Sequence, residues 1–305
     1  MTVDLDAALK FAISIAKEAG QMMRDGQARR FSQDAKQEEK ANSVDLVTEC
    51  DQQVEKFLVA KIKAQYPDHK FIGEESYDGE QVTDDPTWIG DPIDGTTNFI
   101  HGFPMVATSI GLAVGGVPVV GVIYNPFLDL LYTGAEGRGA YMNESIKLPT
   151  AVRSLDSLSE ALVAVEYGSS RRDPALSNKL DTFKRLTGDK RDGHKMVHSL
   201  RSVGSAALNI CFVAAGQLDA YWEIGCWPWD VCAGMAILKE AGGASYAGKI
   251  TEKGFSGEPN ATIMAGRKYL FVRQVPAAKG ETVRAAQATL AKEFYNIIEE
   301  WDPAT

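Results

Sequence analysis

The chain has 305 residues, of which 45% are hydrophobic and 24% charged, and its formal net charge is −9. This composition is typical of a globular protein that is long enough to bury a substantial core. The acidic balance argues against nucleic acid or an anionic membrane as the main partner, because both attract basic surfaces.

The N-terminal part predicts two helices separated by a polar stretch. Apolar residues recur at helical spacing over roughly 5–25. The charged segment 24–40 is most simply a solvated loop, with a frayed helix end or a mobile flap as the alternatives. Thr48, with Asp51 three residues later, resembles a capping box at the start of a second helix, which Pro67 ends.

The middle of the chain predicts a sheet. Two β-branched runs flank Gly115-Gly116, which is typical of a hairpin. Other short runs are expected to be strands of the same half, and one of them delivers two acidic residues. The expected strands are 71–75, 87–90, 106–114, 117–124, 130–133 and 139–143.

Strand and helix signals alternate in the second half, which favours a layered α/β fold, called α+β in some schemes. Segment 149–159 lacks strong periodicity and is a plausible boundary between domains 1–150 and 151–305. Strands are expected at 161–165 and 218–223, and helices at 174–186, 204–215, 230–241 and 281–298.

The most informative segment is 88–99, in which Asp91 and Asp94 follow an apolar run. Pro92 stiffens the expected turn between them. The Ile93 carbonyl is a third candidate oxygen ligand, because hard cations such as Mg²⁺ accept backbone carbonyls. A surface Asp-Gly turn is the alternative interpretation of the motif alone.

The residues that follow this pair are suited to a phosphate. Gly95 permits close approach of the backbone, and Thr96 is placed to open a helix, whose first N–H groups favour anions. Carboxylates beside a phosphate require a cation between them. The segment therefore predicts a Mg²⁺ site for a phosphorylated substrate.

Other acidic residues are expected to join this site, because an α/β fold collects functional residues at strand ends and helix starts. Glu74 follows an apolar run, with a polar strand exit as the alternative. Asp230 lies at a predicted helix start, where an N-cap is the alternative. Asp51 is placed at the edge of the group formed by Glu74, Asp91, Asp94 and Asp230.

Five separate blocks resemble the inositol monophosphatase family, in an order and spacing that fit over roughly residues 5–270. The first family signature is matched by Trp88 to His101, and the second by Trp229-Asp230 through Gly242-Gly243. The other three blocks are 44–48, 71–76 and 200–206.

The resemblance implies stacked α-β-α-β-α layers and a Mg²⁺-dependent phosphomonoesterase related to fructose-1,6-bisphosphatase. It implies two or three Mg²⁺ ions per active site, sensitivity to Li⁺ and a homodimer. One ion would be held by Glu74, Asp91 and the Ile93 carbonyl. A second would be held by Asp91, Asp94 and Asp230, and a third, weaker one would lie near Glu74.

The resemblance also assigns roles in catalysis and substrate binding. Thr96 paired with Asp51 resembles the water-activating pair of the family, and Glu74 acts beside them. Glu223, seven residues before Asp230, matches an acid that accepts hydrogen bonds from ring hydroxyls. The expected substrate contacts are Asp94, Gly95, Thr96, Gly204, Ser205, Ala206 and Glu223.

Three functions are compatible with these residues. The first is hydrolysis of inositol monophosphate to myo-inositol and phosphate. The second is the same chemistry on another small phosphate ester, such as a sugar phosphate or a quinate-pathway metabolite, because one hydroxyl contact redirects specificity readily. The third is a catalytically silent phosphate-binding regulatory protein, which would have lost part of the site.

The remaining signals concern location. The cysteines Cys50, Cys211, Cys226 and Cys232 form no Cys-x-x-Cys motif and are expected to be free thiols in a reducing compartment. Residues 1–6 show no signal-peptide pattern, and no stretch approaches the roughly 18 apolar residues of a membrane helix. We therefore expect a cytoplasmic protein. The tail 299–305 matches no motif.

Overall fold

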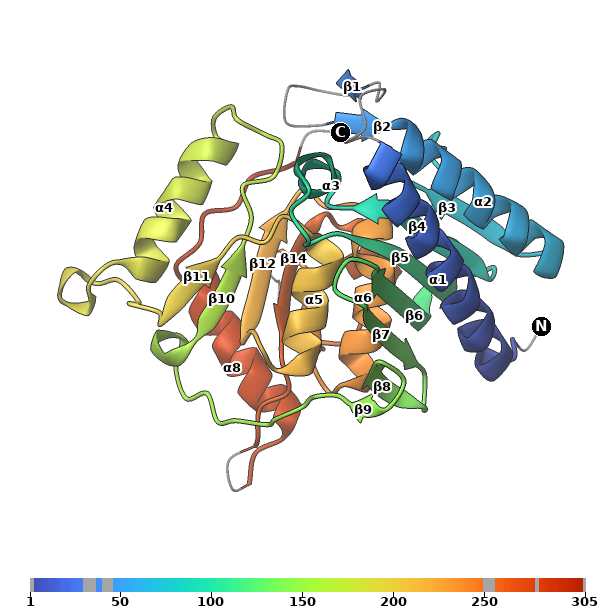
Figure 1. Cartoon of the computed structure of the whole chain (residues 1–305). Coiled ribbons are helices and arrows are strands. Elements are labelled where there is room, and N and C mark those ends of the chain that lie inside the picture. The colour runs from blue at the N-terminus through green and yellow to red at the C-terminus, as the bar shows by residue number, and fades with distance from the viewer. Residues whose placement is uncertain (1–2, 30–36, 40–45, 249–255, 278–279, 304–305) are drawn as a thin grey trace.

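The computed structural model describes residues 3–29, 37–39, 46–248, 256–277 and 280–303. Two sheets and the helices around them form alternating layers (Figure 1). A small antiparallel pair, β1 (Gln37–Glu39) and β2 (Leu46–Thr48), precedes the first of these sheets.

The first sheet has seven strands in the spatial order of the chain, with β3 parallel to β4 and the later neighbours antiparallel. Its strands are β3 (Lys70–Gly73), β4 (Thr87–Asp94), β5 (Ala107–Val114), β6 (Val117–Asn125), β7 (Leu130–Ala135), β8 (Gly139–Met142) and β9 (Ile146–Lys147). The predicted hairpin is confirmed as β5 and β6.

The second sheet has five strands: β10 (Leu162–Val165), β11 (Ser199–Arg201), β12 (Ala220–Ile224), β13 (Ala244–Tyr246) and β14 (Lys268–Val272). Their spatial order is β11-β10-β12-β14-β13. β10 is parallel to both β11 and β12, whereas β14 is antiparallel to β12 and β13. β11, β13 and β14 were not predicted from the sequence.

The described residues include eight α-helices: α1 (Leu5–Arg29), α2 (Glu49–Gln65), α3 (Thr96–His101), α4 (Ala175–Thr187), α5 (Ala206–Ala215), α6 (Pro228–Glu240), α7 (Ala261–Ala265) and α8 (Val283–Tyr295). Two single 3₁₀ turns, η2 (Leu158–Glu160) and η3 (Lys190–Asp192), lie between them. None of these described helices combines the length and apolarity that a bilayer crossing requires.

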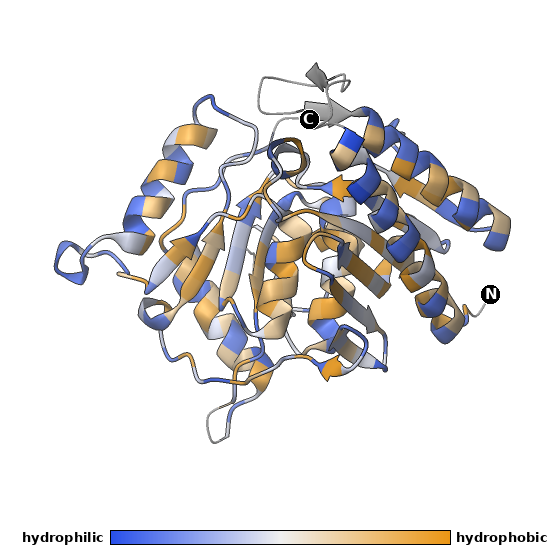
Figure 2. Ribbon diagram, in the orientation of Figure 1, coloured by the Kyte–Doolittle hydropathy of each residue, from blue (hydrophilic) through white to orange (hydrophobic). Residues whose placement is uncertain are grey.

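The layers follow from which faces are apolar. α1 and α2 bury Ile15 and Leu58 against Trp88 on the outer face of the first sheet. α5 and α6 lie between the two sheets and are apolar over most of their surface, whereas α1, α2 and α4 carry hydrophilic stretches (Figure 2). α8 packs Phe294 against Trp222 on the outer face of the second sheet. The predicted α-β-α-β-α layering is confirmed.

Three glycines let α6 lie directly on the first sheet. Gly111, Gly121 and Gly134 are register partners on β5, β6 and β7. A Cβ at Gly111 would lie 2.6 Å from the Cys232 sulfur, and one at Gly121 would collide with the Ala233 carbonyl. The row of glycines therefore sets how closely α6, with its N-terminal turn, approaches β4 and β5.

Several predicted boundaries change in the structure. α1 continues to Arg29, so the first part of the predicted loop 24–40 is helical, while 30–36 and 40 lie outside the described residues. The Thr48 side chain of the predicted capping box is also not described. The other predicted helices and strands differ from their predicted bounds by a few residues, whereas β9 and α7 were not predicted. The domain boundary near residue 150 stays a prediction.

Candidate metal centre and active site

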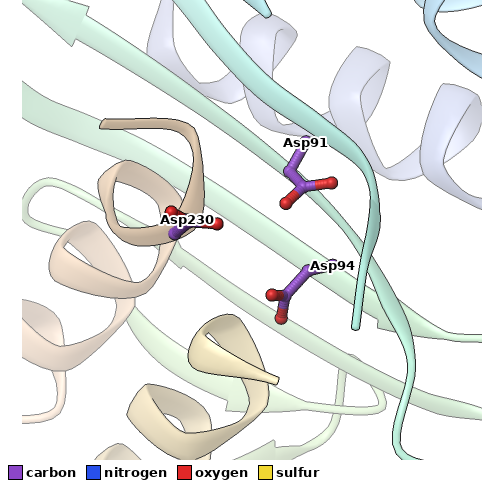
Figure 3. A group of neighbouring side chains, drawn as sticks. All are labelled: Asp91, Asp94 and Asp230. Atoms are coloured by element: carbon purple, nitrogen blue, oxygen red, sulfur yellow. The ribbon is translucent and has the colours of Figure 1, made fainter. Parts of the chain in front are cut away.

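Three buried or half-buried carboxylates converge between the first sheet and α6. Asp91 and Asp94 come from β4, and Asp230 comes from the first turn of α6. One oxygen from each lies within 4.8 Å of the other two. Figure 3 shows the three side chains turned toward a common space.

A bulge in β4 brings Asp91 and Asp94 to the same side. Residues three apart in a regular strand point to opposite faces of the sheet. Here Asp91 pairs with Ser109 and Asp94 with Ala107, so two residues of β4 oppose one of β5. The predicted Pro-containing turn is therefore wrong: Pro92 lies in a bulged strand, which continues beyond its predicted end at residue 90.

Each carboxylate is held by hydrogen bonds. Asp91 Oδ1 accepts the Ile93 N–H at 2.9 Å. Asp94 accepts from the Ser205 hydroxyl and from the Ala206 and Ala207 N–H groups at 3.2 and 2.9 Å, at the N-terminus of α5. Asp230 Oδ2 accepts the Trp227 N–H at 2.5 Å.

Asp230 is thus the third residue of α6, and its carboxylate reaches back to the backbone of the N-cap residue Trp227. It is not itself the N-cap, which was the alternative interpretation of its position. One oxygen of its carboxylate also lies within 4.8 Å of an oxygen of Asp91 and of Asp94 (Figure 3). The residue can therefore fix the start of α6 and face the acidic group at once.

The electrostatics of the group fit a cation. Burial and the neighbouring carboxylates raise the pKa of Asp91 and of Asp230 well above the usual range. Burial likewise raises the pKa of Asp94 to about 6, although its hydrogen bonds oppose the shift. Ionised carboxylates this close repel one another, and an all-oxygen donor set is what Mg²⁺ and similar hard ions prefer.

Two further predicted residues lie near this group. Glu74 follows β3 directly, and its charge raises the pKa values of both Asp91 and Asp230. Asp51 is buried in the first turn of α2 and also raises the pKa of Asp91. The structure therefore brings both acids within electrostatic reach of Asp91.

The turn after β4 continues the site. Thr96 opens α3 as predicted, and its hydroxyl donates to the Ile93 carbonyl at 3.2 Å. Gly95 adopts a φ of +92°, and a Cβ there would lie 2.9 Å from the Met105 carbonyl and 3.0 Å from the Gly204 carbonyl. Only glycine fits this backbone without strain.

The predicted substrate segment 204–206 lies beside Gly95 at the start of α5. Ser205 is the N-cap, and its Oγ accepts the Leu208 N–H at 3.2 Å. Asn98 joins this segment to α3, because its Nδ2 donates to the Val203 carbonyl at 2.8 Å. The turn at Gly95 and the predicted substrate segment are therefore parts of one hydrogen-bonded unit.

The predicted substrate acid Glu223 lies on β12, where the Tyr221 hydroxyl donates to it. Burial and the negative charge of Glu166 raise the pKa of Glu223 to about 7. Glu223 in turn raises the pKa of Asp230, which places the two acids in the same electrostatic environment.

Two acids that hold the loops of the site, Glu166 and Glu55, were not predicted from the sequence. Glu166 accepts the Val203 and Gly204 N–H groups at 2.6 and 2.9 Å. Glu55, buried in α2, accepts the Glu75 N–H at 2.8 Å and so fixes the chain beside Glu74. The only signal in the sequence was the position of each acid: Glu166 directly follows an apolar strand, and Glu55 lies on the apolar face of a helix.

An aromatic group links the two acidic segments. Tyr77, three residues after Glu74, lies with its ring centroid 5.1 Å from that of Trp229 and 5.4 Å from that of Trp227. The two tryptophan rings stack at 5.2 Å, and the Arg267 guanidinium lies 3.6 Å from the Trp227 ring centroid. These contacts fix the loop after β3 against the start of α6.

Known proteins resemble the chain over almost its whole length. The model of the inositol monophosphatase family matches residues 4–299. "Inositol monophosphatase 2" of Saccharomyces cerevisiae is 49% identical over 70% of this chain and 74% of its own length. "Protein qutG" of Emericella nidulans is 39% identical over 98% of this chain and 95% of its own.

The fold has close neighbours among solved structures. The inositol monophosphatase from Anabaena (Nostoc) superposes with a TM-score of 0.72 and 30% sequence identity, covering 95% of this chain and 97% of that one. This superposition shows that the similarity holds for the fold as well as for the sequence.

Proposed function

The chain belongs to the inositol monophosphatase family, and we propose that it hydrolyses inositol monophosphate to myo-inositol and phosphate with Mg²⁺ as cofactor. Its membership makes it a phosphoric monoester hydrolase. The observation that carries the proposal is the bulge in β4, which directs Asp91 and Asp94 toward Asp230 beside a helix start.

The donor set suits two cations. We assign Glu74, Asp91 and the Ile93 carbonyl to one, and Asp91, Asp94 and Asp230 to the other, so that Asp91 is shared. Divalent ions, when bound at such a pair of sites, act as Lewis acids toward phosphate oxygens and lower the pKa of a nearby water. A third, weaker site near Glu74 is part of the same proposal.

The remaining groups orient the reaction. The Thr96 hydroxyl, fixed near the Ile93 carbonyl, and the buried Asp51 carboxylate are assigned to orient the attacking water and accept its proton. The N–H groups of Gly95 and Thr96 are assigned to the phosphate oxygens. The chemistry needs no covalent phosphoenzyme, because water attacks phosphorus directly.

We assign substrate selection to Glu223 and segment 204–206, which together form the proposed substrate wall. The Glu223 carboxylate accepts hydrogen bonds from ring hydroxyls, and the backbone of 204–206 lies against the ring. A second candidate is another sugar phosphate or a quinate-pathway phosphate. The similarity to "Protein qutG" and to "Quinic acid degradation cluster protein x" of Neurospora crassa favours the quinate variant. A silent binding protein is disfavoured by the complete acidic set.

The test is phosphate release from myo-inositol 1-phosphate, with and without Mg²⁺, beside sugar phosphates, a phosphorylated cyclic carboxylic acid and an aryl phosphate. Mg²⁺-dependent preference for the inositol ester supports the proposal, and preference for another ester redirects it. Glu223→Gln is expected to raise KM for the polyol ester about tenfold but not for the aryl ester. The exposed Glu136→Gln is its matched control.

We include a homodimer and a cytoplasmic location in this proposal, as the resemblance and the cysteine content suggest. The four cysteines are free and buried. Light scattering of the purified chain tests the dimer, and a mass equal to one chain would contradict it.

A further inference from the structure

A buried cation lies close to the proposed substrate wall and has no role in the mechanism above. Lys179, on α4, is 3% exposed, and its ammonium donates to the Tyr167 carbonyl. Lysine is almost never fully buried unless its charge is compensated. The groups around Lys179 are therefore expected to compensate its charge.

The acid whose charge acts most strongly on Lys179 is Glu223. A Cβ at Gly168 would lie 3.0 Å from Lys179 Nζ and 3.8 Å from Glu223 Oε1, so the two charged groups converge on this glycine. The two charges also affect each other's pKa. Burial lowers the pKa of Lys179, and the negative charge of Glu223 opposes that shift. Burial raises the pKa of Glu223, and the positive charge of Lys179 opposes that shift. Gly168, with φ of +58°, gives the room for this approach.

The C-terminal segment 299–303 covers this cation. The Trp301 ring centroid lies 5.4 Å from Lys179 Nζ, and the ring meets Trp222 edge-on at 5.8 Å. Trp301 is 8% exposed. The segment is anchored by ion pairs on either side of Trp301, Arg185 with Glu299 at 2.8 Å and Lys268 with Asp302 at 2.7 Å.

The other groups that face Glu223 do not replace Lys179. Glu166, at the end of β10, is negative and opposes ionisation of Glu223, while Tyr221 and Cys226 are neutral hydrogen-bonding neighbours. The positive charge of Lys179 therefore opposes the effect of Glu166 on Glu223. Both residues act in a poorly solvated environment, where interactions between charges are strong.

We propose that Lys179 is a positioning residue for substrate recognition. Its charge attracts the Glu223 carboxylate and its hydrogen bond fixes the Tyr167–Gly168 segment, so that Glu223 is placed to accept ring hydroxyls under a cover formed by Trp301. The inference rests on the proposed role of Glu223. By this proposal, the C-terminal segment 299–303 contributes to substrate specificity through Trp301.

The test compares KM and kcat for the polyol phosphate and for an aryl phosphate, both with Mg²⁺. Lys179→Met is expected to raise KM for the polyol ester about tenfold, with both constants for the aryl ester changing less than about twofold. Lys184→Met, the same change at an exposed position of α4, is the matched control. Combined with Glu223→Gln, Lys179→Met should add little, because the two residues act as one unit.

Trp301 provides a second, independent measurement if Lys179→Met folds poorly. Trp301→Ala is expected to raise KM selectively for the polyol ester, and Trp301→Phe is expected to have a much smaller effect because it keeps an aromatic ring over Lys179. Equal losses on both esters would overturn the inference, as they indicate a merely structural role.

The two proposals fail in different ways. If Glu223→Gln is selective for the polyol ester but Lys179→Met and Trp301→Ala are not, the inference alone is wrong. If Glu223→Gln is not selective, the role assigned to Glu223 and the inference are both wrong, while the proposed hydrolysis is judged by the wild-type protein alone. If the wild-type protein releases no phosphate from any ester, the proposed function and the inference are wrong together.

Discussion

Removing the charge of Asp91 should stabilise the metal-free protein while abolishing its activity. Asp91 is 2% exposed and lies beside Asp94 and Asp230. Asp91→Asn keeps the size of the side chain and the oxygen that accepts the Ile93 N–H. The substitution therefore removes repulsion and leaves the local hydrogen bond in place.

The magnitude follows from the geometry. Two charged carboxylate oxygens within 4.8 Å of each other repel by at least about 3 kcal/mol at an effective dielectric constant of about 20. Partial protonation relieves some of this repulsion, since the pKa of Asp91 is raised. We expect Asp91→Asn to raise the free energy of unfolding in a chelator by about 1–3 kcal/mol at pH 8.

The sign depends on pH. A carboxyl whose pKa is raised in the folded state binds more protons there than in the unfolded chain, so its ionisation costs stability as pH rises. The wild-type protein without metal should therefore lose stability toward high pH. The advantage of Asp91→Asn should grow over the same range and vanish as the pH falls below about 4, where the carboxyls of the unfolded chain are protonated as well.

The assay is urea unfolding at pH 8 with a chelator or with Mg²⁺. Mg²⁺ at 100 times its dissociation constant should stabilise the wild-type protein by about 2.7 kcal/mol and the variant far less. The exposed Asp192→Asn is the control. A variant that is less stable than wild type in the chelator, or that gains as much from Mg²⁺, would refute the reasoning.

Two further predictions concern stability and pH. Arg273→Met should lower the free energy of unfolding by about 3–5 kcal/mol, because it leaves the buried Asp219 without the guanidinium that lies 2.6 Å away. The variant should keep the kcat of the wild-type protein. A loss below about 1 kcal/mol in urea unfolding would contradict this prediction. KM for the polyol ester should rise as pH falls below about 7, since the pKa of Glu223 is about 7 and its protonated form accepts fewer hydroxyls. The aryl ester and Glu223→Gln should lack this dependence, and a profile shared by both esters would count against it.

The sequence predicted those parts of the site that lie in short, contiguous segments. Asp91, Asp94 and Thr96 fall within six residues, and a segment of this kind carries its own pattern of ligands and turn residues. The hairpin of β5 and β6 was found for the same reason. Local patterns predict elements whose partners are near in the chain.

The missed features depend on contacts between distant segments. Glu166 and Glu55 are single acids whose partners lie 38 and 20 residues away in the chain. The strand β14 is antiparallel to β12, from which α6 and β13 separate it, so no hairpin signal marks it. The bulge was also missed, because it exists only in the pairing of β4 with β5.

The acidic group is therefore a property of the layers as well as of the motif. The bulge fixes the direction of Asp91 and Asp94, but the distance to Asp230 is set by how closely α6 approaches the sheet, and the row through Gly121 sets that approach. A chain could keep all three aspartates and still lose the site if this row gained side chains. The same dependence explains why the glycines of β5, β6 and β7, which carry no chemistry, belong to the catalytic architecture as firmly as the carboxylates do.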